Sequence, residues 1–303
     1  MADLSVNVCG VDFKNPIIPA SGVFGYGHEY EELFPLSKLG GIATKGTTLN
    51  QRTGNLAPRI AETPSGMLNS VGLQNPGINH FIEKDLPYLM TKDTVILANF
   101  AGSTVEECIA VAEKLDSTDV HMLELNISCP NVKQGGAAFG TSCEMAAEVT
   151  SQVRKVTNKP LVVKLSPNVT SIADIAKAVE AAGADAVSLI NTLLGMRIDI
   201  NTGRPILKNN VGGMSGPAVF PIAVRMVWQV ANAVNIPVIG MGGVSSGKDA
   251  IELMMAGASA VQVGAAIFTD PFAPVRIVEE MNEFLDSMGI ESVRDIIGTV
   301  KPW

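Results

Sequence analysis

A cysteine and two lysines stand where predicted buried strands end. Cys129 lies in the segment Asn126–Asn131, after an apolar run and before a proline, and Lys45 and Lys164 each close another apolar run. Charged side chains are rarely buried alone, so these lysines indicate a ligand or a structural ion pair, for example of Glu124 with Lys164. A thiol beside such a site can act as a base, an acid or a nucleophile.

Asparagine is concentrated near the same strand ends. Its side chain both donates and accepts hydrogen bonds, so a set of them complements a ring with alternating N–H and C=O groups. The pattern favours a pyrimidine or another ureide as ligand, and a carboxylate on that ring would suit Lys45. The asparagines concerned are Asn69, Asn75, Asn99, Asn126, Asn131 and Asn191.

Two glycine-containing turns predict a phosphate site. The seventh and eighth apolar runs lead into Gly240–Gly243 and Gly264–Ala266. Glycine lets backbone N–H groups approach an anion, and the turns after strands seven and eight are the common phosphate site of barrels. The alternative is that these glycines only make tight turns. The stretch Gly242–Asp249 resembles a P-loop, but Asp249 replaces the required hydroxyl residue, so we expect Lys248 to be a solvated residue of a first helical turn.

The other cysteines and the histidines predict no metal site. No Cys-x-x-Cys pair is present, and the three histidines are scattered along the chain. Free cysteines are more often buried packing residues, which is our expectation for Cys9, Cys108 and Cys143. We therefore expect four free thiols.

Eight apolar runs alternate with helix-like segments, which would bring these residues to one end of a barrel. The expected strands are Ile17–Ala20, Gly41–Thr44, Thr94–Asn99, His121–Asn126, Pro160–Leu165, Ala186–Ile190, Ile236–Gly240 and Ala260–Val263. The expected helices include Thr104–Leu115, Glu144–Val156, Ile172–Ala182, Pro217–Ala233, Gly247–Ala256 and Pro271–Met288. Eight such units predict an α/β fold of the (β/α)₈ TIM-barrel type. A doubly wound sheet is the alternative, but its usual glycine fingerprint after the first strand is missing.

The helix ends carry the expected capping residues. Ser103, Ser171 and Ser246 precede helices as N-caps, and Gly183 and Gly257 follow helices as C-terminal glycines. These signals support the predicted boundaries.

The remaining segments extend the barrel. We expect a β-hairpin over Leu4–Ile18 and long functional insertions at Gly46–Pro76 and Asn191–Gly216, within one domain covering residues 1–303. The glycine-rich segment Val132–Ser142 could close over the site as a lid.

Composition excludes several other classes of protein. The chain is 47% hydrophobic and 17% charged, as suits a parallel sheet buried on both faces. Its net charge of −8, without a basic cluster, argues against nucleic acid as a partner. The chain starts without a signal-peptide pattern and contains no long apolar run, so we expect a cytoplasmic protein that does not bind membranes.

Together these motifs resemble the dihydroorotate dehydrogenases, in particular the class 1B catalytic subunit, over nearly the whole chain. The most specific segments are Asn126–Asn131 (NISCPN), Asn69–Gly77 (NSVGLQNPG), Lys164–Asn168 (KLSPN), Asn191–Arg197 (NTLLGMR) and Gly240–Gly243 (GMGG). Their order and spacing make the resemblance specific. It departs from the family at Ser142–Cys143, where an acidic residue and a proline are expected.

The resemblance implies bound FMN and oxidation of dihydroorotate to orotate in pyrimidine (UMP) biosynthesis. Cys129 would remove the C5 proton while a hydride passes from C6 to flavin N5, and Lys164 would stabilise the charge gained on reduction. The implied FMN-binding residues are Ser21, Lys45, Gly46, Asn99, Asn126, Lys164, Ile190, Gly216, Gly242, Gly243, Gly264 and Ala265. The implied substrate-binding residues are Lys45, Asn69, Ser70, Val71, Gly72, Leu73, Asn126, Asn191 and Thr192.

Class 1B membership further implies a partner. The segment Gln74–Pro76 is similar to that class, whose members pair with an iron–sulfur flavoprotein subunit that carries FAD and a 2Fe–2S cluster and passes electrons to NAD. A homodimer of this chain would form the core of a heterotetramer. The alternatives are a flavin barrel acting on another dihydropyrimidine, a fumarate-linked class 1A enzyme, and a non-catalytic barrel that binds a phosphorylated metabolite.

Overall fold

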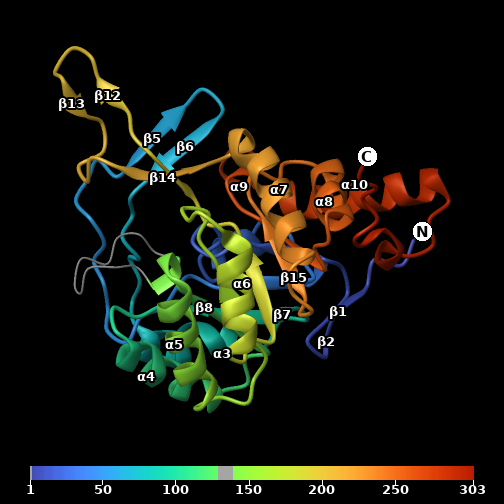
Figure 1. Cartoon of the computed structure of the whole chain (residues 1–303), viewed down its shortest axis with the longest axis horizontal. Helices are drawn as coiled ribbons and strands as arrows, with labels where there is room; N and C mark the ends of the chain where they lie inside the picture. Colours follow the sequence, from blue (N-terminus) through green and yellow to red (C-terminus); the bar gives the residue numbers. More distant parts are fainter. Residues whose placement is uncertain (1, 129–138) are drawn as a thin grey trace.

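Eight parallel strands form the centre of the molecule in a computed structural model that describes residues 2–128 and 139–303 (Figure 1). Their order, β3-β16-β15-β10-β9-β8-β7-β4, follows the chain around a nearly closed barrel, and each neighbouring pair is parallel. This confirms the predicted (β/α)₈ architecture and excludes the doubly wound alternative. The strands are β3 (Ile17–Pro19), β4 (Gly41–Ala43), β7 (Val95–Phe100), β8 (Met122–Asn126), β9 (Leu161–Lys164), β10 (Ala186–Leu189), β15 (Val238–Met241) and β16 (Ala260–Val263).

One buried asparagine joins the two ends of this sheet. Strands β3 and β4 stand first and last in this order, and the place where they meet is the seam of the barrel. There the amide N–H of Gly40 donates to the carbonyl of Ile17 at 3.1 Å. Asn15, only 5% exposed, accepts hydrogen bonds from both of those residues' amides and donates to the carbonyl of Lys38. A Cβ on Gly40 would lie 1.8 Å from the carbonyl oxygen of Asn15, so the seam requires glycine there.

Helices surround the strands, and each of the longer ones buries one face. In α4 the buried residues Cys108, Val111, Ala112 and Leu115 recur at helical spacing, which places them together against the barrel. The longer helices are α4 (Val105–Asp116), α5 (Cys143–Arg154), α6 (Ile172–Ala181), α7 (Phe220–Ala231), α8 (Gly247–Met255) and α10 (Ala273–Met288). Shorter ones are α1 (His28–Glu31), α2 (Ile78–His80), α3 (Leu86–Leu89) and α9 (Ala266–Thr269), with a π-helix at Phe81–Asp85 and 3₁₀ turns at Leu36–Lys38, Phe139–Thr141, Pro217–Val219 and Val293–Ile296.

The two predicted insertions pair with each other, which the sequence did not reveal. Their strands form a four-stranded antiparallel sheet in the order β11-β14-β6-β5. This sheet and a further small hairpin project beyond one end of the barrel (Figure 1). The strands are β5 (Ile60–Thr63), β6 (Gly66–Asn69), β11 (Leu193–Gly195) and β14 (Gly212–Ser215), with β12 (Ile198–Asp199) and β13 (Arg204–Pro205) in the small hairpin.

The N-terminal hairpin and most capping residues agree with the sequence analysis. Strands β1 (Val6–Val8) and β2 (Val11–Phe13) pair antiparallel, and the hydroxyls of Ser171 and Ser246 cap α6 and α8. The prediction for Ser103 was wrong: Thr104 is the N-cap of α4, because its hydroxyl accepts from the amide of Glu107.

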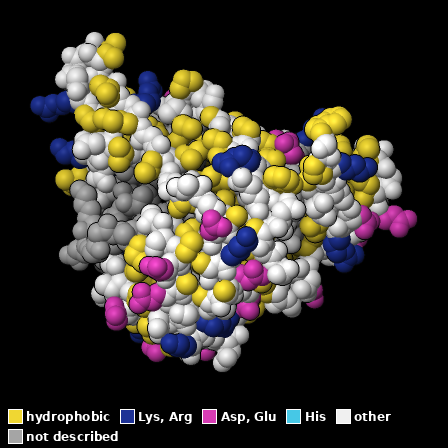
Figure 2. All heavy atoms as spheres, viewed as in Figure 1, with side chains coloured by type: hydrophobic (Ala, Val, Ile, Leu, Met, Phe, Trp, Pro, Cys, Tyr) yellow, Lys and Arg dark blue, Asp and Glu magenta, His cyan; other side chains and the backbone are white. Residues whose placement is uncertain are grey.

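The glycines after α6 and α8 take the conformation expected of C-terminal glycines. Gly183 and Gly257 have φ values of 100° and 118°, a range open mainly to glycine. Among the described helices, none is long and apolar enough to span a membrane. Figure 2 shows lysine and arginine side chains dispersed over the visible face rather than gathered in one cluster.

Candidate active site

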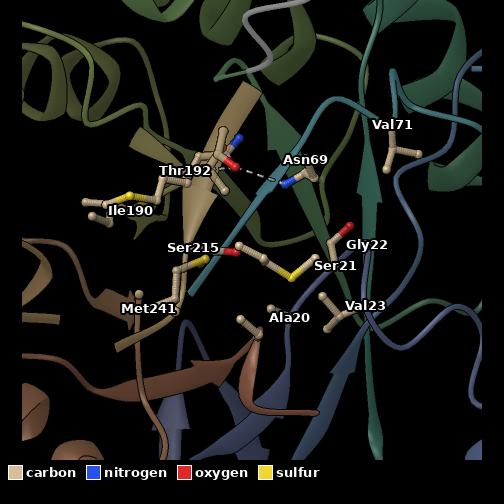
Figure 3. A pocket seen from close by; sticks show the side chains of 18 of the residues that line it. Ala20, Ser21, Gly22, Val23, Asn69, Val71, Ile190, Thr192, Ser215 and Met241 are labelled. Atoms are coloured by element: carbon tan, nitrogen blue, oxygen red, sulfur yellow. Dashed lines mark hydrogen bonds between the residues drawn. The ribbon is translucent and has the colours of Figure 1, made fainter. Parts of the chain in front are cut away.

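A pocket opens at the carboxyl ends of the barrel strands, beneath the four-stranded sheet. Its wall combines strand ends of the barrel with residues of both insertions. Figure 3 shows Ile190 and Met241 on one side of the open space and Ser21 and Val23 on the other. Barrel enzymes use this end of the fold for catalysis.

Lys164 is the most distinctive charged group of the pocket. It is 5% exposed, and within the described residues no carboxylate or other acceptor pairs with it. The ion pair with Glu124 that we considered is not formed, because Glu124 accepts hydrogen bonds from Asn99, Ser188 and Gln262 instead. A buried ammonium without a partner is unfavourable, so Lys164 is placed to meet an electron-rich ligand.

Asn99 lies just below the pocket wall rather than lining it. Its amide nitrogen donates to Glu124 at 2.5 Å, and its buried Oδ1 has no hydrogen-bond partner. That oxygen would be 2.7 Å from a Cβ on Gly46, whose missing side chain opens the wall there. Asn99 therefore provides an unused acceptor beside the pocket.

The predicted glycine turns form one side of the pocket. Gly242 and Gly243 have φ values of 128° and 75°. A Cβ on Gly243 would lie 2.8 Å from the Gly216 carbonyl oxygen and from the Phe220 amide nitrogen, so a side chain would collide with backbone. Gly264, after the neighbouring strand β16, adds a second side-chain-free stretch, where a Cβ would meet nothing closer than 3.8 Å. Both turns thus expose backbone to a ligand, as a phosphate site requires.

The neighbouring P-loop-like segment is a helix cap. Asp249 accepts hydrogen bonds from the amides of Ser245 and Ser246, and with Ser246 it completes a capping box at α8. Lys248 is exposed, as predicted.

The loop after β6 forms another wall. Asn69 donates to the carbonyl of Gly213 on β14 at 3.4 Å, the contact drawn in Figure 3. Leu73 has the left-handed φ of 54°, an uncommon conformation for a residue with a side chain. Asn75 supports this conformation by donating to the Leu73 carbonyl at 2.7 Å. Asn75 itself does not line the pocket, so this asparagine stabilises the loop and is not a ligand-binding group.

A chain of hydrogen bonds fixes the end of β8. The Oδ1 atom of Asn126 accepts from the amide and hydroxyl of Ser128, whose oxygen also accepts from Asn191 at 2.5 Å. Asn191 Oδ1 in turn accepts from the amide of Thr192. Within the described residues the NH₂ group of Asn126 donates to nothing, which leaves it for a ligand in the pocket.

Three sequence-based predictions at this end concern residues that the structure does not describe. The predicted base, Cys129, follows Ser128 directly, but both it and Asn131 lie outside the described residues, as does most of the proposed lid, Val132–Ser142. Their roles stay predictions.

The pocket gathers nearly all of the other predicted site residues. Ser70 is the second exception besides Asn99: it is fully buried and its hydroxyl has no partner. The predicted residues that line the pocket are Ser21, Lys45, Gly46, Asn69, Val71, Gly72, Leu73, Asn126, Lys164, Ile190, Asn191, Thr192, Gly216, Gly242, Gly243, Gly264 and Ala265.

Sequence reasoning missed the apolar lining. Ile60, Met67 and Met214 reach the pocket from the second sheet, and Met241 and Phe268 come from the barrel. The length of the two insertions was the available signal for the first group, but it did not identify which residues face inward.

The described thiols differ from one another. Burial raises the pKa of Cys108 to about 12 and that of Cys9 to about 11, as expected for inert packing residues. The prediction of a buried Cys143 was wrong, because this residue is exposed at the start of α5. Among the described residues, no cluster of three or more His, Cys, Asp or Glu side chains could hold a metal ion.

The fold and the position of the pocket define an α/β-barrel enzyme. The chain belongs to the dihydroorotate dehydrogenase family, whose model matches residues 3–285. Similar proteins are named dihydroorotate dehydrogenase B (NAD(+)), catalytic subunit. That of Geobacillus sp. (strain WCH70) is 55% identical over 98% of this chain and 96% of its own length. Those of Petrotoga mobilis and Bacteroides thetaiotaomicron are 53% and 54% identical, over 99% of this chain and 100% of theirs.

Proposed function

We propose that this chain binds FMN and oxidises dihydroorotate to orotate in pyrimidine biosynthesis, as the catalytic subunit of an NAD-linked enzyme. The observation that carries the proposal is that one pocket at the carboxyl end of the barrel gathers the residues that the family resemblance implies. Full-length similarity to proteins of that name supports the same activity.

The chemistry of the pocket fits FMN. Its pyrimidine edge has carbonyl and ring-nitrogen acceptors that match the ammonium of Lys164, which pairs with no acceptor among the described residues, and an N–H that matches the unused oxygen of Asn99. The turns at Gly242–Gly243 and Gly264–Ala265 would hold the phosphate through backbone N–H groups. When bound, FMN supplies a two-electron acceptor.

Protein groups would contribute charge and orientation. Lys164 would stabilise the negative charge that accompanies reduction of the ring, because it is buried and has no competing carboxylate among the described residues. Lys45 would bind the substrate carboxylate, while Asn69, Asn126 and Asn191 would hydrogen-bond the dihydropyrimidine ring. These contacts favour a carboxylated dihydropyrimidine.

We assign to Cys129 the removal of the substrate C5 proton. Ser128, the residue before it, is held by Asn126 and Asn191, so the backbone enters Cys129 from a fixed point beside the pocket. A nearby cation would favour the thiolate. None of the three described cysteines, Cys9, Cys108 and Cys143, lines the pocket, which leaves Cys129 as the candidate base.

A partner subunit would complete the reaction with NAD. We propose an iron–sulfur flavoprotein with FAD and a 2Fe–2S cluster, joined to a homodimer of this chain in the cytoplasm. The phrase "catalytic subunit" in the relatives' names is the support for a partner. Efficient NAD reduction by the isolated chain would contradict this part of the proposal, and efficient fumarate reduction would favour the class 1A alternative.

The visible spectrum of the purified chain tests the main proposal. We expect a flavin spectrum that bleaches on anaerobic addition of dihydroorotate and does so far more slowly with dihydrouracil. Bleaching by dihydrouracil alone would indicate another dihydropyrimidine as substrate. A colourless chain that takes up no added FMN would contradict the proposal and favour a non-catalytic barrel.

The variant Cys129→Ser tests the base. We expect it to keep FMN but to lose roughly a hundredfold or more in the rate of flavin reduction near neutral pH, because a serine hydroxyl gives up its proton far less readily than a thiol. Stopped-flow absorbance measures this rate. An unchanged rate would remove Cys129 from the mechanism.

A further inference from the structure

Glu124 is a fully buried carboxylate inside the barrel, below the pocket floor, and the proposed reaction gives it no role. Its Oε2 atom accepts from Asn99 Nδ2 at 2.5 Å. Its Oε1 atom accepts from Ser188 Oγ and Gln262 Nε2, both at 2.7 Å. The donors stand on β7, β10 and β16, so this one side chain, on β8, links four strands across the barrel.

The contacts of Glu124 determine how two amides are turned. A carboxylate only accepts hydrogen bonds, so each amide facing it must present its NH₂ group and direct its oxygen elsewhere. Asn99 and Gln262 both do this, and both of their oxygens are buried without a partner. The exposed fractions of these side chains are 1% and 0%, so water does not offset the cost. Such orphaned acceptors indicate a ligand that donates.

Of these two amides, that of Asn99 lies next to the pocket wall. Its Oδ1 lies against Gly46, 2.7 Å from where a Cβ would be, and Gly46 and Ser21 both line the wall at that point. Without Glu124, the amide of Asn99 could rotate by half a turn and present NH₂ to the pocket instead. The carboxylate thus selects an acceptor over a donor at this position.

We propose that Glu124 is a positioning residue that holds the Asn99 amide with its oxygen toward the pocket, so that the site accepts a cyclic ligand presenting an N–H there. This inference rests on the proposed binding of FMN, whose oxidised ring system has one N–H, at N3. Glu124 itself does not touch the ligand. It acts through Asn99, which donates to its Oε2 atom, whereas Ser188 and Gln262 donate to the other oxygen, Oε1.

The test compares FMN with N3-methyl-FMN, which lacks that N–H. Apoprotein of the full chain is titrated with each flavin, and binding is followed by quenching of flavin fluorescence. We expect the wild type to prefer FMN by roughly tenfold to a hundredfold, the range for a buried acceptor that loses its donor. In Glu124→Met the preference should fall to less than about threefold, because FMN binding weakens while N3-methyl-FMN binding changes little.

Ser188→Ala is the matched control. It removes one donor to the same carboxylate without touching Asn99, so it should lose stability but keep the wild-type preference for FMN. A second variant, Glu124→Gln, keeps the shape of the side chain and replaces Glu124→Met if that variant does not fold. Its preference for FMN over N3-methyl-FMN should lie between that of the wild type and the threefold limit expected for Glu124→Met. A Ser188→Ala preference that falls as far as that of Glu124→Met would mean that barrel stability, not amide orientation, is responsible.

The outcomes separate this inference from the proposed function. Wild-type protein that binds neither flavin would overturn both. Wild-type protein that binds FMN without preferring it over N3-methyl-FMN, or a folded Glu124 variant that keeps the full preference, would overturn the role of Glu124 and leave FMN binding intact.

Discussion

Asn75 and Asn99 are both buried asparagines beside the pocket, yet their hydrogen bonds differ. Asn75 uses both ends of its amide: it accepts from the amides of Thr48 and Gly77 and donates to Thr48 and Leu73. Asn99 uses only its nitrogen, and its oxygen has no partner. Asn75 is 4% and Asn99 1% exposed, so burial does not distinguish them.

The comparison shows how a structural amide can be told from a binding one. Where every donor and acceptor is satisfied within the chain, the group stabilises the fold, and a ligand has nothing left to bind. Where a buried acceptor such as Asn99 Oδ1 or a buried ammonium such as that of Lys164 has no partner among the described residues, the fold bears a cost that a ligand can offset. Removing members of the two groups should therefore have opposite effects.

The largest effect on folding is expected for Asn75→Ala. The substitution leaves the amides of Thr48 and Gly77 and the carbonyl of Leu73 without their partner, so the free energy of unfolding should fall by about 3 kcal/mol. Urea unfolding of the apoprotein measures this. The exposed neighbour Asn79, changed to alanine, is the control and should lose less than about 0.5 kcal/mol. Equal losses in the free energy of unfolding for Asn75→Ala and Asn79→Ala would contradict the structural role given to Asn75.

A smaller and opposite effect is expected for Lys164→Met. Removal of a buried charge that has no partner within residues 2–128 and 139–303 should leave the free energy of unfolding of the apoprotein unchanged or raise it by up to about 1 kcal/mol. FMN should bind roughly 10- to 150-fold more weakly, since a hydrogen bond from a charged donor is lost. Urea unfolding and flavin titration measure the two quantities, with the exposed Lys177→Met as control. A clear loss of apoprotein stability would mean that Lys164 has a structural partner.

The smallest effect concerns His121, a satisfied group outside the pocket. Its Nδ1 accepts from the amide of Ile96 on β7 at 3.0 Å, which requires the neutral ring. Burial, and next the nearby Lys159, lower its pKa below the ordinary value of 6.5. The unfolded chain therefore binds the proton more readily, so the stabilisation by His121 is present above about pH 6.5 and is lost as the pH falls through that value toward the folded-state pKa.

The pH dependence of His121→Leu checks this. The free energy of unfolding of the wild type minus that of the variant should fall by about 1 kcal/mol or less between pH 7 and pH 5. Parallel curves for the two proteins would show that the ring is not held neutral by the fold.

The sequence predicted the barrel better than the site's interior. Each predicted strand lies within two residues of an observed one, because fully buried parallel strands are continuous apolar runs bounded by glycine and polar residues. Most polar ends of these runs, including Lys164, line the pocket for the same reason, and Asn99 lies just below its wall. The glycine turns were found because their position after strands seven and eight is set by the fold.

The partners of buried polar groups could not be predicted. Glu124 and Gln262 are 138 residues apart and meet only because the barrel closes, so local pattern gives no sign of their contact. The same limit explains why Asn75 was grouped with the ligand-binding asparagines. Cys143 lies one residue before the predicted helix Glu144–Val156, so helical spacing gave no sign that it is exposed at the start of α5.

The pairing of β6 with β14 links residues about 145 positions apart in the chain. The four-stranded sheet over the pocket therefore cannot form from either half of the protein alone. During synthesis from the N-terminus, the segment Gly66–Asn69 has no strand to pair with on that side until Gly212–Ser215 has been made. We expect this sheet to assemble late, after the first six barrel strands have been made, and a chain cut short before residue 212 to lack the binding site.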